Sequence, residues 1–142
     1  MNRGITIIEL LLVVAIISTL GVMSISFYAR FLTQNEVGNT VDRLIGSFRK
    51  AQVYSMMGKQ NGTWGVRYTT SPKKITLYLV GNSAFDESYD VNDNITVSGF
   101  TDITFARITG LPSGGSFPLT ITISGGNSSK IIDLNSQGVA SR

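Results

Sequence analysis

The chain has 142 residues and a formal net charge of +3, from 12 Lys and Arg against 9 Asp and Glu. It contains no Cys and no His, which excludes disulfides and removes the usual zinc and haem ligands and the Ser–His and Cys–His catalytic pairs. Because the sequence also has no G-x-S-x-G motif, Walker loop or metal-ligand cluster, we expect a structural protein rather than an enzyme, and no cofactor.

The first feature in chain order is an apolar segment from Ile5 to Ala29, in which Glu9 is the only charged residue. At 1.5 Å per residue its 25 positions make a helix of roughly 37 Å, which is long enough to cross a bilayer with some tilt. A carboxylate at mid-membrane costs roughly 2.5 to 3.5 kcal/mol, so Glu9 calls for an explanation. Two explanations stay open: a first-turn residue near the interface that complements the helix dipole, or a functional group.

The short leader 1–4, which ends in Gly4, and the apolar helix with Glu9 five places later resemble the class III signal of type IV pilins and type II secretion pseudopilins. The resemblance implies that a prepilin peptidase cuts between Gly4 and Ile5. It further implies N-methylation of the new amino terminus at Ile5 and a role for Glu9 in filament assembly. Ile5 stands where the family usually has Phe, and the leader has a single basic residue.

Two other interpretations of residues 5–29 explain less of the sequence. An ordinary secretory signal needs small residues in an A-x-A pattern, which only residues 24–26 approximate. A plain membrane anchor fits the length but leaves the spacing of Gly4 and Glu9 to coincidence.

From residue 30 to residue 58 the apolar residues continue on one face only, at the spacing of an amphipathic helix. That face holds Val37, Val41, Leu44, Ile45, Phe48 and Val53, and the opposite face holds Asp42, Arg43, Arg49, Lys50 and Gln52. We expect one helix from Ile5 to about Met57, which ends in a left-handed residue at Gly58 or near Asn61-Gly62.

Residues 59–142 change to a period of two, with Thr, Val, Ile and aromatic residues between turn residues, which predicts a small antiparallel β-sheet. The expected strands are residues 63–69, 75–80, 95–98, 103–108, 119–124 and 130–134. Two sets of alternating residues are expected to face the helix: Trp64, Val66 and Tyr68, and Ile75, Leu77 and Leu79. The fold class is α+β, with a long N-terminal hydrophobic helix packed on this sheet.

The expected organisation is thus a leader at 1–4, a transmembrane and assembly helix at 5–29, the amphipathic half of the same helix at 30–58, and a globular β domain at 59–142. Motifs in this last part narrow the resemblance to the GspH/FimT-like minor pseudopilins. They are Trp64-Gly65, Phe105, Thr109-Gly110-Leu111-Pro112, Lys130-Ile131-Ile132-Asp133-Leu134 and Gly138.

The acidic stretch 86–94 holds the weak calcium candidates Asp90, Asn92 and Asn94, which alternate as calcium-loop ligands do. Ile95 stands where an EF-hand has its sharp-turn glycine, and the terminal Glu is missing. We therefore prefer a solvated loop with Asx turns and assign no metal site.

The resemblance implies a minor pseudopilin-like subunit of a type II secretion pseudopilus or type IV pilus. Its implied partners are other subunits, the prepilin peptidase, the assembly platform and, before assembly, membrane lipid. The implied location is the bacterial inner membrane, crossed once, with the β domain in the periplasm, and then the fibre. Alternatives are a DNA-binding minor pilin of a competence system, for which the Lys and Arg residues are too scattered, and a membrane-anchored ligand-binding domain that does not polymerise.

Overall fold

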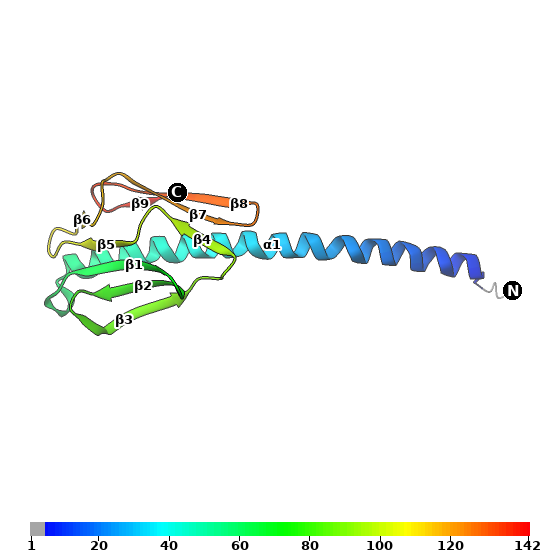
Figure 1. The fold of residues 1–142 in the computed structure, drawn as a ribbon, viewed down its shortest axis with the longest axis horizontal. Helices are drawn as coiled ribbons and strands as arrows, with labels where there is room; N and C mark the ends of the chain where they lie inside the picture. Colours follow the sequence, from blue (N-terminus) through cyan, green and yellow to red (C-terminus); the bar gives the residue numbers. More distant parts are fainter. Residues whose placement is uncertain (1–4) are drawn as a thin grey trace. The chain divides into compact units, whose positions relative to one another are not determined.

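The computed structural model describes residues 5–142, without the side chains of 23–26, so Gly4 and the expected cleavage after it lie outside the described residues. One long helix is followed by a small β domain, which confirms the α+β class (Figure 1). Helix α1 runs from Ile7 to Met56 without interruption. The chain divides into two compact units, the first ending at Leu32 and the second spanning Thr33–Arg142.

Helix α1 ends as the sequence predicts. Gly58 has a left-handed backbone, with φ 61°, and its N–H donates to the carbonyl oxygen of Ser55 at 3.1 Å. A single 3-10 turn, η1 at Lys59–Asn61, then leads into the first strand. Trp64 ties this turn to the helix, because its backbone N–H donates to Ser55 Oγ at 2.8 Å and its indole N–H donates to the carbonyl of Lys59 at 3.0 Å.

The strands of the described residues form two antiparallel sheets rather than the one expected. The first has the order β3-β2-β1-β5-β6 and the second the order β4-β7-β8-β9 (Figure 1). Their bounds are β1 Trp64–Thr70, β2 Lys73–Leu79, β3 Asn82–Asp90, β4 Ile95–Ser98, β5 Asp102–Phe105, β6 Pro112–Ser113, β7 Leu119–Gly125, β8 Ser128–Leu134 and β9 Ala140–Ser141.

All six predicted strands are present, and three more occur. The strand expected at 103–108 ends at Phe105, because Ile108 has a φ of 74° and donates its N–H to the carbonyl of Ser55 instead of to a ladder. Strand β3 was expected to be loop. Asp86, Glu87 and Asp90 lie in it, and it escapes the apolar pattern because almost all of its residues are exposed.

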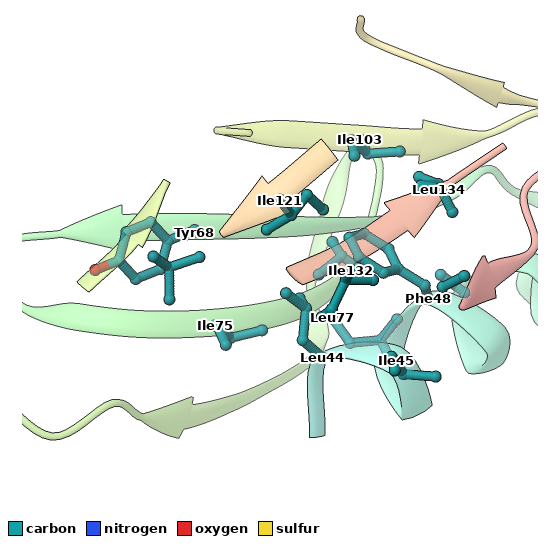
Figure 2. Packing of buried hydrophobic residues seen from close by; sticks show 14 of the residues in the cluster. Leu44, Ile45, Phe48, Tyr68, Ile75, Leu77, Ile103, Ile121, Ile132 and Leu134 are labelled. Carbon is teal, nitrogen blue, oxygen red and sulfur yellow. The ribbon is translucent and has the colours of Figure 1, made fainter. Parts of the chain in front are cut away.

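One hydrophobic cluster joins the second half of α1 to both sheets; Figure 2 labels Phe48 of α1, Leu77 of β2 and Ile132 of β8 among its members. The alternating residues of β1 and β2 that were predicted to face the helix are all buried: Trp64, Val66, Tyr68, Ile75, Leu77 and Leu79. The helical stripe is also confirmed from Val37 to Phe48. Val53, however, is 48% exposed. Five residues after Phe48 advance the helix by about 500°, so Val53 turns away from the core and Ala51 and Ser55 continue the buried face.

Candidate functional site: the apolar half of helix α1

The apolar side chains of α1 before Leu32 are exposed along the whole described length. Ile7 is 81% exposed, Leu12 59% and Ile17 63%. Soluble proteins rarely leave a continuous apolar surface of this length in water. Among the described residues, α1 is long and apolar enough to cross a membrane.

Within this half, Leu10 to Ala29 is a run of 20 residues without any charge, bracketed by Glu9 and Arg30. At 1.5 Å per residue the run is about 30 Å long, which equals the typical thickness of the hydrocarbon core of a bilayer. Tyr28, 65% exposed, is the second-last residue of the run, where aromatic residues favour the membrane–water interface. Both charges would thus lie at the hydrocarbon boundaries.

Two hydroxyl groups inside the charge-free run, those of Ser18 and Thr19, bond to the helix itself. Ser18 Oγ donates to the carbonyl of Val14 at 2.8 Å. Thr19 Oγ1 lies 3.0 Å from the carbonyl of Ala15 and 2.9 Å from that of Ile16. Since an unsatisfied hydroxyl in hydrocarbon is costly, these bonds make Ser18 and Thr19 compatible with lipid surroundings.

Glu9 lies in the first turn of α1, and Thr6 caps that turn. The Thr6 hydroxyl oxygen accepts a hydrogen bond from the Glu9 backbone N–H at 3.3 Å, and the Thr6 carbonyl accepts one from Leu10 at 3.1 Å. The helix therefore begins two residues later than the sequence suggested, because Thr6 can cap it. Threonine followed three residues later by glutamate is the spacing of a capping box, and a carboxylate here also complements the helix dipole.

Glu9 is exposed, and its carboxylate has no ion-pair partner among residues 5–142. Ile5, which would carry the new amino terminus after cleavage, is 75% exposed. The predicted processing residue Ile5 and the predicted assembly residue Glu9 thus lie at the same end of the chain, and both have exposed side chains.

The weak calcium candidates end strand β3 and form the turn after it. Asp90 Oδ1 lies 3.4 Å from the Lys74 ammonium, and Asn92 Oδ1 accepts a hydrogen bond from the Asn94 N–H at 2.9 Å. The second contact is the Asx turn that the sequence predicts. The part of the chain that the structure describes holds no group of three His, Cys, Asp or Glu residues arranged for a metal.

A lysine binds the backbone of the same turn. Lys73 Nζ donates to the carbonyl of Asp93 at 2.6 Å and to that of Ile95 at 2.8 Å. A calcium ion in this turn would draw on such carbonyl oxygens, and here an ammonium group binds them.

Most motif residues of the β domain converge at the C-terminal end of α1. A Cβ at Gly138, where φ is 79°, would lie 2.6 Å from Gln52 Nε2 and 3.0 Å from Phe105 Cε1. A Cβ at Gly110 would lie 2.6 Å from Met56 Cγ. The two glycines therefore permit the loops to pack closely on the helix. The 130–134 motif lies elsewhere, in β8.

Sequence reasoning missed Gln52, which was placed on the solvent face. Its side-chain amide is half-buried and donates to the carbonyl of Gly110 at 3.1 Å and to that of Gln137 at 2.7 Å. Gln52 thus holds two loops on the helix. The sequence carried no signal for it, because both partners are backbone groups far along the chain.

Comparisons with protein-family models, with curated proteins and with solved structures found no match for this chain.

Proposed function

We propose that this chain is a structural subunit of a filament. It is a prepilin-like protein, processed after Gly4 and assembled through α1, and it belongs to a type II secretion pseudopilus or type IV pilus as a minor subunit. One observation carries the proposal. A single helix combines an exposed apolar half, with Glu9 in its first turn, and a second half that forms the core of a β domain.

The length of the charge-free run supports residence in the inner membrane before assembly. With Glu9 and Arg30 at the two boundaries of the hydrocarbon core, the subunit crosses the bilayer without placing either charge at its centre. Lipid then covers the apolar side chains that are exposed in the isolated chain. After extraction into a filament, the same side chains would be covered by the apolar helices of neighbouring subunits.

Cleavage would create a charged amine at Ile5, four residues before Glu9, in surroundings where an unpaired charge is costly. A neighbouring subunit displaced along the fibre axis can bring its own Ile5 amine to Glu9, which neutralises both charges and sets the axial register. Removing one partner of a buried pair costs about 3 to 5 kcal/mol, compared with about 0.3 to 1 kcal/mol for a charge at a helix terminus.

The test is incorporation of Glu9→Leu into fibres. The variant is expected to insert into the membrane at least as well as the wild type and to be cleaved after Gly4, yet to be depleted in the sheared fibre fraction relative to the membrane fraction. Incorporation at the wild-type level would contradict the proposed role of Glu9.

Processing is tested separately by intact-mass measurement or N-terminal sequencing of protein from a host with the peptidase. We expect a chain that starts at a methylated Ile5, and full-length precursor when a bulky residue replaces Gly4. A mature chain that starts at Met1, or after Ser26, would exclude the class III signal.

A further inference from the structure

Ile108 combines a strained backbone with an exposed apolar side chain. It has a φ of 74°, a conformation that β-branched residues rarely adopt, and its side chain is 73% exposed. Its N–H donates to the carbonyl of Ser55 in the last turn of α1 at 3.1 Å, which fixes the loop in place. The fold therefore holds an isoleucine in water at a conformational cost, a combination that points to a binding role.

Ile108 is one of several exposed apolar residues around the amide of Gln52. We name this surface the Gln52 patch; it consists of Val53, Met56, Ile108, Leu111 and Val139, which are 43% to 73% exposed. The hydrogen bonds from Gln52 to Gly110 and Gln137 bring the loops of Leu111 and Val139 to the helix face that carries Met56.

The patch is preformed. The Gln52 amide anchors both loops, and Gly110 and Gly138 pack so closely that neither has room for a side chain. A rigid surface loses little conformational entropy on binding, which favours a specific protein partner. The patch also lacks the aromatic residues and the lysine cluster that are typical of a surface that binds lipid.

Two arginines lie on the segments that form the patch. Arg49 lies four and seven residues before Val53 and Met56, and therefore on their face of α1, and Arg107 precedes Ile108. Neither arginine has an ion-pair partner in the described part of the chain. The segments that form the patch contain no carboxylate.

The complementary surface occurs on the same chain, at strand β3. Residues 80–94 carry four carboxylates and no Lys or Arg, and they expose Val80 by 51% and Phe85 by 37%. β3 is also an edge strand of the five-stranded sheet, so one side of its backbone is unpaired within that sheet (Figure 1). Glu87 and Asp90 bind Lys50 and Lys74 within the chain. Asp86 and Asp93 have no ion pair in the described part of the chain, and of the two only Asp86 lies in β3.

We propose that the Gln52 patch of one copy binds the β3 edge of a second copy. Phe85 of the second copy packs on Ile108 and Met56, and Asp86 pairs with Arg107. Because the two surfaces differ, the contact is heterologous and joins two neighbouring copies. The inference rests on the proposed function in that the filament brings the copies together.

Engineered disulfides test the contact directly, because the full chain contains no Cys. Two full-length variants, Ile108→Cys and Phe85→Cys, are expressed together, and disulfide dimers are counted in membrane and fibre fractions after mild oxidation. We expect the mixed 85–108 dimer at least about tenfold above either variant expressed alone. Ile131→Cys is the matched control for Ile108→Cys, because it is an apolar residue of β8, 53% exposed, outside the patch.

Charge reversal gives a second readout that a misfolded variant cannot imitate. Arg107→Glu and Asp86→Arg should each lower the yield of the mixed dimer by about threefold to tenfold, and co-expression of the two reversed chains should restore it. A 108–108 dimer, a mixed dimer no more abundant than the Ile131→Cys control, or no rescue by the double reversal would overturn the proposal.

The outcomes also separate this inference from the proposed function. If Glu9→Leu is lost from fibres while the mixed dimer fails to form, the filament assignment stands and the Gln52 patch has another partner. If the mixed dimer forms but Glu9→Leu assembles normally, the contact stands without the proposed role of Glu9.

Discussion

The replacement of Trp64 by alanine tests the packing of the β domain on α1. The indole ring is 1% exposed and makes an edge-on contact with the ring of Tyr54, with 4.9 Å between the ring centroids. Truncating a buried Trp to Ala typically costs about 3 to 5 kcal/mol, and an aromatic pair contributes about 0.5 to 1.5 kcal/mol beyond its buried area. We therefore expect Trp64→Ala to lower the free energy of unfolding by about 4 kcal/mol.

The assay is urea unfolding of the fragment Thr33–Arg142, followed by far-UV circular dichroism because Trp64 is the only Trp of the chain. This fragment should be soluble and folded, because every buried hydrophobic residue of the described structure lies between Val37 and Ala140. Domains of this size have a total stability of about 5 to 15 kcal/mol, so the variant should be close to unfolding in water.

Two variants calibrate the result. Trp64→Phe keeps an apolar ring but loses the hydrogen bond to the Lys59 carbonyl, and should cost about 1 to 2 kcal/mol. Val139→Ala, at a residue 52% exposed, should change stability by less than about 0.5 kcal/mol. A cost for Trp64→Ala as small as that for Val139→Ala would refute the assignment of the ring to the core.

Three further predictions follow from particular residues. Gly138→Ala should lower the free energy of unfolding in urea by about 2 kcal/mol or more, because a Cβ has no room there. Gly126 also has a left-handed backbone, but the nearest atom to its Cβ position is 3.4 Å away, so Gly126→Ala should cost only about 1 to 2 kcal/mol of backbone strain. Ile108→Asn should raise the melting temperature, because Asn tolerates the left-handed backbone that Ile108 is held in; Ile108→Val should not. Burial, with the hydrogen bond to Asp102, raises the pKa of Tyr78, so the folded state keeps a proton that the unfolded chain loses above about pH 10. The contribution of Tyr78 to stability should be fully present below that pH and decrease above it. Tyr78→Phe should therefore show a smaller decrease of the melting temperature at alkaline pH in a series of thermal melts.

The helix and the inward faces of β1 and β2 were predictable because their burial follows a simple period. A helix stripe recurs every 3.6 residues and a strand face every 2, and both patterns are local. The prediction that Val53 belongs to the buried stripe was wrong, because two residues five positions apart do not lie on the same face of a helix. Ser55 is buried in place of Val53, and its hydroxyl oxygen accepts a hydrogen bond from the Trp64 backbone N–H.

Strand β3 and Gln52 could not be predicted, for a common reason. β3 exists because its backbone pairs with β2, while its side chains remain exposed and polar, so no apolar alternation marks it. Gln52 is held by carbonyl groups 58 and 85 residues further along the chain. Such contacts depend on the path of the backbone in space and leave no trace in local composition. The Gln52 patch depends on the same contacts, so the sequence could not predict it either.

The cap at Thr6 makes the two explanations of Glu9 separable. If Glu9 only stabilised the start of α1, it would act in the same way as Thr6, whose hydroxyl accepts the Glu9 N–H. Losing an N-cap hydroxyl costs about 1 kcal/mol, and losing a first-turn carboxylate costs about 0.3 to 1 kcal/mol. Thr6→Ala should then impair fibre incorporation at least as much as Glu9→Leu. A charge pair between neighbouring subunits predicts the opposite order, because Thr6→Ala leaves the carboxylate in place while Glu9→Leu leaves an amine unpaired among apolar helices. We expect Thr6→Ala to enter fibres nearly as well as the wild type, and equal loss of the two variants would reduce Glu9 to a residue of the helix start.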